Sequence, residues 1–515
     1  MNAVDFTSLL SCPASEVPEP EPVSSVPLTA EQTAWIEEVC AGRRCFLSAR
    51  AGTGKTSTIC AAVRTCAQRN LPLPAVIAFN KRIAEELKVK LPEGTQVQTL
   101  HSLGFATLRS FARGIKVNPS RTFEMLRKRP LRNTPAKPKR WKDTYALVGI
   151  LKAYGFIPSG APSLFRSPSL LKLSSIEELC TQQRLFDADP EIATEVLLES
   201  LQDFLTSQTI DYTDMVYLPY ALGLVPRLPS STLIDEAQDL SALDIAFLSR
   251  ATSKLFPVGD PYQSLYGWRG ATKDILRCLA LVEFPLTCCW RCAKDIIHVA
   301  QSWVPDIVSG RKESGSVSYL DSPPNFERLP PSVCIGRTNA DLIDLALPLL
   351  SKGIPVCFLG KSFAEDLISD VKEFKSSGYA GLSSEISSWV SSMGSKYPQL
   401  DFEFKNKGKI LLGLLTLYQS KPALLNALSS LFSDAPRTGA WTFSTVHASK
   451  GLEFPEVYLA SWDQKDYDDD ETHRNLMYVA ITRAKDTLKF FEPQTPEPLP
   501  ETRSQAAFST DPFLF

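Results

Sequence analysis

Residues Ala49–Thr56 spell A-R-A-G-T-G-K-T, a glycine-rich turn of the kind that can bind phosphate groups. The turn follows the apolar run Cys45–Leu47, which predicts a strand, and precedes Ser57–Arg64, which predicts the opening of a helix. A glycine-rich turn at a helix N-terminus presents backbone N–H groups and the positive end of the helix dipole to an anion. The residues expected to surround the phosphates are Ala51, Gly52, Thr53 and Gly54. The sequence therefore predicts a nucleoside triphosphate site.

Two side chains at the end of this turn have types suited to phosphoryl chemistry. Lys55 could reach the terminal phosphates, and the hydroxyl group of Thr56 could hold Mg²⁺. The segment departs from the pattern G-x-x-x-x-G-K-[ST] at one position, because Ala49 stands where the first glycine is usual. A chance glycine-rich turn is the alternative interpretation, and the complete G-x-G-K-T between a strand and a helix disfavours it.

A pair of carboxylates follows a second apolar run. Leu233 and Ile234 precede Asp235 and Glu236, so the acidic pair is expected at the C-terminal end of a strand, where α/β sheets bind ligands. Asp235 could complete the Mg²⁺ shell that Thr56 opens. Glu236 could orient and deprotonate an attacking water molecule. Acidic pairs commonly cap strands, so this pattern gains its weight only in combination with the glycine-rich turn.

Apolar runs that alternate with helical patterns predict the elements that must position these residues. The runs are Cys45–Leu47, Ala75–Phe79, Val97–Leu100, Ser231–Ile234 and Lys254–Val258, then Ser332–Gly336, Pro355–Leu359, Trp441–Val446 and Val457–Ala460. This alternation is typical of parallel sheets flanked by helices. We therefore expect an α/β fold with two lobes, interrupted by the mostly helical stretches Phe105–Thr209 and Phe363–Pro436.

Composition limits the class of protein. The chain has 515 residues, of which 44% are hydrophobic, and its longest apolar stretches are far too short to span a membrane. Twelve cysteines without a regular framework suggest reduced thiols inside a cell, in the cytoplasm of a bacterial or phage host or in a eukaryotic nucleus. Cys289 and Cys292 form a lone C-x-x-C, which disfavours a zinc site. The net charge of −2 gives no indication of nucleic acid.

Together these segments resemble the superfamily 1 DNA helicases of the UvrD/Rep/PcrA type. The resemblance extends from Leu28 to about Phe491 and is carried by eight segments besides the glycine-rich turn and the acidic pair. They are Leu28–Gln32, Val76–Lys81, Thr99–Ser102, Val258–Ala271, Trp290–Arg291, Arg337–Asn339, Thr445–Phe454 and Leu476–Lys485. Tryptophan at position 290 departs from the tyrosine of the family, and the stretch Phe363–Pro436 is shorter than in the larger relatives.

The resemblance implies that the nucleotide is ATP and that Mg²⁺ accompanies it. Gln32 would contact the adenine edge, Trp290 would stack on the adenine ring, and Glu453 would lie near the ribose. It also assigns three catalytic side chains besides Lys55 and Glu236. Gln263 would sense the γ-phosphate, Arg291 would reach it, and Arg483 would act as the arginine finger.

The resemblance further implies contacts with single-stranded DNA and with junctions between single and double strands. The residues assigned to DNA are Phe79, Asn80, Thr99, His101, Tyr266, Trp268, Asn339 and His447. Stacking aromatics suit a motor that does not read sequence, because every base has a π-face. For an isolated aromatic residue the core is the more common location. The basic run from Arg127 to Lys142 is either a solvated face, a phosphate-binding surface or a nuclear import signal.

The implied activity is an ATP-dependent DNA helicase that moves 3′ to 5′, since Ser449–Phe454 favours that group over 5′-to-3′ relatives. A translocase that strips proteins from single strands is the nearer alternative. A non-catalytic nucleic-acid-binding scaffold is the more distant one, and it would predict losses at Lys55, Glu236 or Arg483, all of which are present. The C-terminal tail could dock a replication or repair protein, or it could be unused.

The implied organisation is two RecA-like lobes, each with an insertion. The segments, in chain order, are a disordered lead (1–27), the first lobe (28–104 and 210–280) with its helical insertion (105–209), the second lobe (281–362 and 437–492) with its small helical insertion (363–436), and a flexible tail (493–515).

Overall fold

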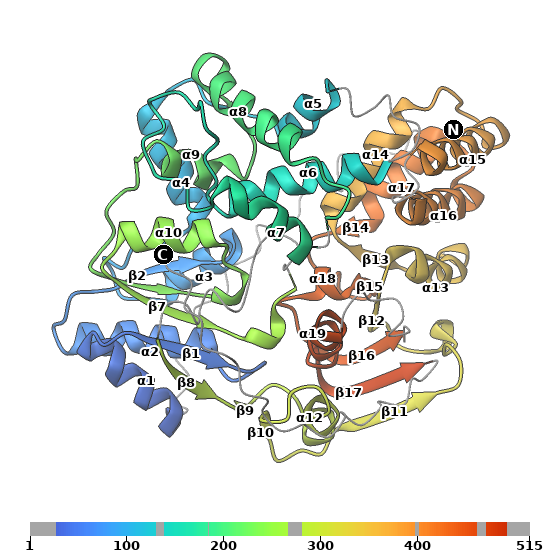
Figure 1. Cartoon of the computed structure of the whole chain (residues 1–515). Coiled ribbons are helices and arrows are strands. Elements are labelled where there is room, and N and C mark those ends of the chain that lie inside the picture. Colours follow the sequence, from blue (N-terminus) through green and yellow to red (C-terminus); the bar gives the residue numbers. More distant parts are fainter. Residues whose placement is uncertain are drawn as a thin grey trace, which may run out of the picture.

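The computed structural model describes residues 27–129, 138–183, 185–265, 281–396, 401–460 and 470–491. Within these residues the chain forms two lobes, each built on a parallel sheet, as Figure 1 shows. The expected α/β class with two RecA-like lobes is therefore confirmed. The predicted lead, the predicted tail and residues 130–137 of the basic run lie outside the described residues. Among the helices of the described part, none is both long and apolar enough to cross a bilayer.

The first lobe contains a six-stranded sheet in the order β3-β2-β6-β7-β1-β8. Its strands are β1 (Cys45–Ala49), β2 (Ala75–Ala78), β3 (Val97–Thr99), β6 (Ser231–Ile234), β7 (Lys254–Gly259) and β8 (Val282–Leu286). Its helices are α1 (Ala30–Ala41), α2 (Lys55–Gln68), α3 (Lys81–Lys90), α4 (Leu100–Phe111) and α10 (Ala242–Ala251). Strand β8 begins after residue 280, the expected end of this lobe, yet it pairs in parallel with all of β1. The sheet of the first lobe therefore extends to Leu286.

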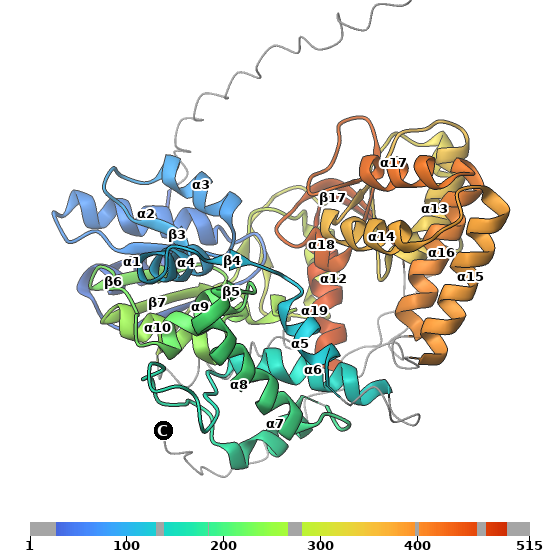
Figure 2. The same ribbon diagram turned by 90° about the horizontal axis from the view of Figure 1, so that it is seen from above.

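A mostly helical region lies between β3 and β6. Besides α4 it contains α5 (Arg121–Arg127), α6 (Pro138–Ala153), α7 (Ile176–Gln182), α8 (Pro190–Ser207) and α9 (Asp214–Ala221), with a short parallel pair of β4 (Lys116–Val117) and β5 (Thr209–Ile210). Figure 2 shows these helices on one side of the first sheet, with α5 and α6 nearest the second lobe. Apolar side chains from α4 to α10 form the core of this region.

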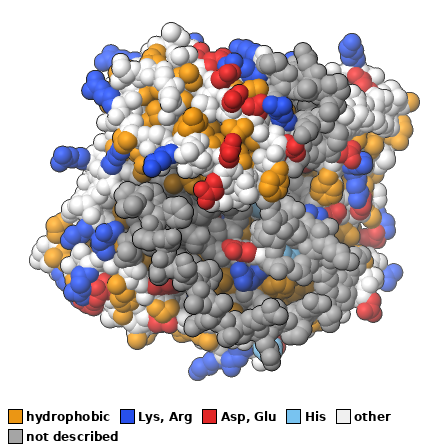
Figure 3. All heavy atoms as spheres, in the orientation of Figure 1, with side chains coloured by type: hydrophobic (Ala, Val, Ile, Leu, Met, Phe, Trp, Pro, Cys, Tyr) orange, Lys and Arg blue, Asp and Glu red, His pale blue; other side chains and the backbone are white. Residues whose placement is uncertain are grey.

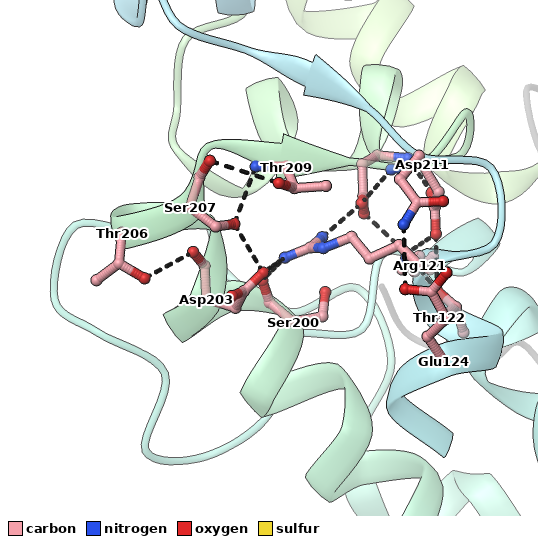
Figure 4. Close-up of polar contacts among 12 residues, drawn as sticks. Arg121, Thr122, Glu124, Ser200, Asp203, Thr206, Ser207, Thr209 and Asp211 are labelled. Carbon is pink, nitrogen blue, oxygen red and sulfur yellow. Dashed lines mark hydrogen bonds and ion pairs between the residues drawn. The ribbon is translucent and has the colours of Figure 1, made fainter. Parts of the chain in front are cut away.

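A buried network of charges fixes the helical region to the start of α9. Arg121 donates to Asp203 at 2.9 Å and to Asp214 at 2.8 Å, and its position between α5, α8 and β5 is visible in Figure 4. Lys152 lies 2.8 Å from both Asp211 and Asp214. Charges removed from water are tolerated only when they are paired and hydrogen-bonded. The two cations and three carboxylates of this network pair with one another.

Replacing Lys152 by methionine should therefore destabilise the protein by about 3–5 kcal/mol, because Asp211 and Asp214 would stay buried without their shared cation. The free energy of unfolding, measured in urea, tests this expectation. Lys409→Met is the matched control, since Lys409 pairs with Asp344 on the surface and such pairs contribute at most about 1 kcal/mol. Equal losses in the two variants would contradict the structural role of the network.

The second lobe contains a seven-stranded sheet in the order β11-β17-β16-β12-β15-β13-β14. Its strands are β11 (Ser316–Leu320), β12 (Val333–Gly336), β13 (Val356–Leu359), β14 (Phe432–Ser433), β15 (Trp441–Thr445), β16 (Phe454–Ala460) and β17 (Ala484–Phe491). Helices α12 (Lys294–Gln301), α13 (Asn339–Ser351), α18 (Val446–Ser449) and α19 (Asp470–Ile481) belong to this lobe. Four more helices lie between β13 and β14, namely α14 (Lys361–Glu373), α15 (Tyr379–Lys396), α16 (Asp401–Tyr418) and α17 (Lys421–Leu431).

The two lobes meet along a continuous apolar cluster. Ala51 and Leu265 of the first lobe pack into the same core as Ile296 and Tyr478 of the second. A buried guanidinium adds a polar contact, because Arg50 binds the carboxylate of Asp306 through Nε at 2.8 Å. The short pair of β9 (Cys288–Cys289) and β10 (Val308–Ser309) follows β8 and connects the lobes. The loop after β1 consequently lies at the boundary between the lobes.

Candidate active site between the two lobes

The glycine-rich turn connects β1 to α2 at the lobe boundary. Gly52 and Gly54 have φ values of +67° and +87°, in the left-handed region that glycine adopts without strain. A Cβ atom at Gly52 would lie 2.5 Å from the Cβ atom of Arg291 and 2.8 Å from the sulfur of Cys289. Glycine at position 52 is therefore required both by the backbone conformation and by the close approach of residues 289–291.

Gln32, which the resemblance assigns to the adenine edge, lies beside this turn. Thr29 and Gln32 form a capping box at the start of α1, in which the Gln32 side chain accepts from the Thr29 backbone at 2.9 Å. The Gln32 amide also donates to the Thr58 hydroxyl at 2.9 Å, which ties α1 to the first turn of α2. A Cβ atom at Gly54 would lie 3.3 Å from Nε2 of Gln32. The capping box thus holds Gln32 against the phosphate-binding turn.

The acidic pair lies at the C-terminal end of β6, opposite Lys55. Asp235 is buried, and its backbone N–H donates to Ile77 at 3.0 Å, which continues the pairing of β6 with β2. Glu236 has a φ value of +52°, an uncommon conformation for a residue with a side chain. Its carboxylate lies 3.7 Å from Nζ of Lys55. The strand end and the turn together bring Lys55, Asp235 and Glu236 into one site.

The two carboxylates differ in their electrostatic surroundings. Burial raises the pKa of Asp235, and the charge of the neighbouring Glu236 raises it further. Burial acts in the same direction on Glu236, but the charges of Lys55 and Lys450 outweigh it and lower the pKa of Glu236. Glu236 is therefore ionised at neutral pH, as a general base must be.

A chain of hydrogen bonds connects Glu236 to Gln263. Gln238 donates to Glu236 at 2.5 Å, and its amide oxygen accepts from the backbone of Asp260 at 3.0 Å. The Asp260 carboxylate in turn accepts from the Gln263 side chain at 2.7 Å. Gln238, Asp260 and Gln263 are all buried. Such a network fixes the orientation of Gln263, which the resemblance assigns to the γ-phosphate. It does so through Gln238 and Asp260, to which the resemblance assigns no role.

The second lobe reaches this network through two side chains that the sequence analysis also left without a role. The Tyr478 hydroxyl accepts from the backbone N–H of Ala51 at 2.8 Å and donates to Asp260 at 3.3 Å. Lys450 lies 2.5 Å from the Asp239 carboxylate and donates to the backbone oxygen of Gln263 at 2.9 Å. Movement between the lobes would change these contacts directly.

The two arginines assigned to the γ-phosphate lie on the second-lobe side of the site. Arg291 binds Glu453 through Nε at 2.5 Å. Arg483 is buried, and it donates to the backbone oxygens of Val479 and Leu452, each at 2.9 Å. Burial and the charge of Arg291 lower the pKa of Arg483 to about 10, so it is still a cation at neutral pH. The charge of Arg483 contributes to lowering the pKa of Glu236 across the lobe boundary.

The residues assigned to the base and the ribose lie next to the turn. The Trp290 backbone donates to Gly52 at 2.9 Å, while 48% of the tryptophan side chain is exposed. Glu453 binds Lys485 at 2.7 Å in addition to Arg291. Burial alone would raise the pKa of Glu453, but the Lys485 and Arg291 cations outweigh it and lower the pKa. An exposed ring beside the turn suits stacking on a purine.

The residues assigned to DNA follow the C-terminal ends of four strands. Phe79 and Asn80 follow β2, Thr99 ends β3, Asn339 lies just beyond β12, and His447 lies just beyond β15. The carboxyl ends of parallel strands are where α/β sheets bind ligands. Asn80 and Thr99 also cap α3 and α4, accepting from Ile83 at 2.9 Å and from Ser102 at 3.1 Å. Tyr266 and Trp268 lie outside the described residues.

The positions assigned to DNA differ in exposure and surroundings. Phe79, His101 and His447 are exposed. The centre of the Phe79 ring lies 5.7 Å from Nζ of Lys450. Asn339 and His447 line one hollow of about 400 Å³ together with Phe363. On the face shown in Figure 3, basic and acidic side chains are interspersed among the described residues. The strand ends and this hollow are therefore the features that favour DNA contact at these positions.

Comparison with known proteins identifies relatives of both lobes. Residues 28–280 match the UvrD/REP helicase N-terminal domain, and residues 441–489 match the UvrD-like helicase C-terminal domain. A probable DNA helicase of Mycoplasma pneumoniae is 24% identical over 85% of this chain and 78% of its own length. Gabija protein GajB of Bacillus cereus is 26% identical over 49% of this chain and 61% of its own length.

A longer relative extends the similarity across both lobes. F-box DNA helicase protein 1 of Schizosaccharomyces pombe is 24% identical over 92% of this chain, which spans 58% of that protein. The two domain matches occur in the order of the two lobes, and the matched residues include the glycine-rich turn, the acidic pair, Lys450 and Arg483. The chain belongs to the UvrD/Rep-type family of superfamily 1 DNA helicases.

Proposed function

We propose that this protein is an ATP-dependent helicase that moves 3′ to 5′ along single-stranded DNA and couples ATP hydrolysis to closure of the two lobes. The observation that carries the proposal is the position of the glycine-rich turn between the lobes. Ala51 and Gly52 contact Tyr478 and Trp290, while Lys55 contacts Glu236. A ligand in this turn would touch both lobes, so its binding and release would alter their separation.

The chain's own residues have the chemistry that ATP and Mg²⁺ require. Asp235 is buried, and within the described residues its carboxylate forms no ion pair, so a divalent cation would neutralise it. Thr56, at the start of α2, would supply the hydroxyl ligand. Asp235 and Thr56 would hold Mg²⁺, which would supply positive charge against the negative charge that develops during phosphoryl transfer. Lys55 would hold the terminal phosphates in the same turn.

Four side chains would act on the attacking water and the transferred phosphoryl group. Glu236 is ionised and would orient and deprotonate the water. Gln263 is held by Asp260 and would report the presence of the γ-phosphate to the DNA-facing part of the protein. Arg291 and Arg483 would approach the phosphoryl group when the lobes close, since both belong to the second-lobe side. Gln32, Trp290 and Glu453 would bind the nucleoside.

The DNA-facing residues support a strand that crosses both lobes. Phe79 and His101 belong to the first lobe, whereas Asn339 and His447 belong to the second. If both groups hold the same strand, each cycle of closure can shift one grip relative to the other. Opening one base-pair step costs roughly 1–2 kcal/mol, which one hydrolysis event can supply. Aromatic stacking would let the motor move without reading sequence.

A strand-displacement experiment tests the proposal. We expect the protein to open a duplex with a 3′ single-stranded DNA tail in the presence of ATP and Mg²⁺, and to open a duplex with a 5′ tail or an RNA tail far less. The released strand is measured by fluorescence. Glu236→Gln protein serves as the control for opening that does not require hydrolysis.

Two outcomes would overturn parts of this proposal. Preferential opening of the 5′-tailed duplex would contradict the assigned polarity. Removal of streptavidin from a biotinylated single strand, with no duplex opening on any tail, would favour the alternative of a protein-stripping translocase.

A further inference from the structure

Two cysteines flank the residues assigned to the adenine and the γ-phosphate. Cys289 and Cys292 enclose Trp290 and Arg291, and both thiols are fully buried. The Cys289 sulfur lies against the glycine-rich turn, only 2.8 Å from where a Cβ atom at Gly52 would lie. The roles assigned above use neither thiol. Both cysteines pack in the apolar core between the lobes, and no chemical role has been assigned to either thiol.

The Cys289 sulfur contacts the backbone of Cys292. The backbone N–H of Cys292 donates to the Cys289 sulfur at 3.4 Å, and the Cys292 thiol lies 3.8 Å from the backbone oxygen of Thr482. A hydrogen bond from the Cys292 thiol, reinforced by backbone N–H groups and opposed by burial, lowers the pKa of Cys289 to about 7. The same hydrogen bond, together with burial, raises the pKa of Cys292. One nucleophilic thiol beside one protonated thiol is the arrangement of redox-active C-x-x-C pairs.

Metal binding does not account for the pair. Across the described part of the chain, no group of three or more cysteine, histidine or acidic residues is placed to hold a metal ion. Zinc sites need four ligands, or three with an open position. Thiol–disulfide chemistry is a use that a C-x-x-C segment without metal ligands leaves open.

We propose that Cys289 and Cys292 form a reversible disulfide when the protein meets a small-molecule disulfide of the glutathione class, and that this bond stops ATP hydrolysis. The effect on hydrolysis rests on the proposed function, whereas formation of the bond does not.

The reaction balances as two thiol–disulfide exchanges. The Cys289 thiolate attacks one sulfur of the external disulfide, whose S–S bond breaks and releases one thiolate. Cys292 then loses its proton, and its thiolate attacks the Cys289 sulfur of the mixed disulfide, releasing the second thiolate. The two cysteines lose two electrons, and the external disulfide is reduced to two thiols. Excess dithiothreitol reverses both exchanges.

The bond would disturb the site because Trp290 and Arg291 lie within the ring that it closes. In the reduced protein, the Trp290 backbone donates to Gly52, and Arg291 binds Glu453. A misplacement of reacting groups by about 1 Å can lower a rate about 100-fold. The sulfurs are covered by the turn at Gly52, so oxidation requires residues 289–292 to separate from it. Bound nucleotide, which joins the lobes, should therefore slow oxidation.

The experiment treats the full chain with oxidised glutathione and follows two readouts. Trypsin cuts after Arg291, between the two cysteines, so a disulfide leaves peptide 278–291 joined to peptide 292–294 in a digest without reductant. DNA-stimulated ATP hydrolysis is measured on the same sample before and after dithiothreitol. The variants are Cys289→Ser and Cys292→Ser. Cys40→Ser is the control, because the Cys40 sulfur lies 3.8 Å from that of Cys66, away from the lobe boundary.

We expect the joined peptides to appear with oxidised glutathione, more slowly with a non-hydrolysable ATP analogue and Mg²⁺. Hydrolysis should fall about tenfold or more and recover with dithiothreitol. Both active-site variants should resist this loss, and the Cys40→Ser protein should still show it. Absence of the joined peptides, or their presence with full hydrolysis, would overturn the inference. A reduced protein without ATPase activity would count against the proposed function instead, and the digest would still decide whether the bond forms.

Discussion

Replacing Glu236 by glutamine should lower DNA-stimulated ATP hydrolysis by about 100- to 10,000-fold, the usual contribution of a general base. Glutamine keeps the size of the side chain and can still accept a hydrogen bond from Gln238, which contacts this carboxylate at 2.5 Å. The amide of the substituted glutamine cannot accept a proton at neutral pH. Steady-state phosphate release in the presence of single-stranded DNA measures the effect. Glu85→Gln is a suitable control, because Glu85 is exposed and pairs with Lys88 on the surface of α3.

A second variant separates the chemical step from nucleotide binding. Lys55→Ala removes the cation that would hold the terminal phosphates, so both the affinity for a fluorescent ATP analogue and the hydrolysis rate should fall. Glu236→Gln should bind the analogue as tightly as the natural protein does. Substantial hydrolysis by either purified variant would contradict the assigned site, and weakened binding in Glu236→Gln alone would reassign that carboxylate to ground-state contacts.

The parts of the fold that the sequence predicted are those with strong local signals. The run Ser231–Ile234 predicted β6 with its observed bounds, because four residues without charge end abruptly at two carboxylates. The buried central strands β1, β2, β12 and β13 were predicted for the same reason, since strands covered on both faces form continuous apolar runs. Local patterning was sufficient for these strands, which are interior strands with continuous apolar runs.

The strands that the sequence analysis missed carry weaker patterns. Strand β8 reads V-E-F-P-L, and β11 reads S-V-S-Y-L. Both are edge strands of their sheets, where proline and exposed polar residues are tolerated. Strand β17 reads A-K-D-T-L-K-F-F, a mixed pattern, although it lies between β11 and β16. Because β8 carried no clear signal, the first lobe was expected to end at residue 280.

The contacts across the lobe boundary could not be predicted from local sequence. Tyr478 and Ala51 are separated by 427 residues, and Lys450 and Asp239 by 211 residues. Each contact depends on how the two lobes are oriented, which no single segment encodes. Tyr478, Lys450, Gln238 and Asp260 nevertheless lie within or beside the segments that carried the resemblance. Their positions in or beside these segments could have drawn attention to them, but their contacts become apparent only when the two lobes are placed together.

Replacing Arg483 by lysine should lower the turnover number by about 1,000-fold or more, since an arginine finger contributes about 10³–10⁵ to phosphoryl transfer. Lysine keeps a positive charge but lacks the planar fork that contacts two oxygen atoms at once. The Arg483 guanidinium has five N–H donors, and three of its hydrogen bonds go to Val479, Leu452 and Thr482. Donors therefore remain for a phosphoryl oxygen.

The division of the effect between kcat and KM tests whether Arg483 acts on the reacting group. A contact made mainly in the transition state lowers kcat while leaving KM nearly unchanged. Arg483 is also buried among backbone oxygens of its own lobe, so the same variant could simply weaken the fold. Thermal unfolding and binding of a fluorescent ATP analogue separate these possibilities.

Arg437→Lys is the control, because the Arg437 guanidinium donates to backbone oxygens of Ser430 and Phe432 far from the nucleotide turn. A lower unfolding temperature with an unchanged kcat would assign Arg483 a structural role, whereas a large loss of kcat in a stably folded protein that binds nucleotide would establish that the second lobe completes the active site.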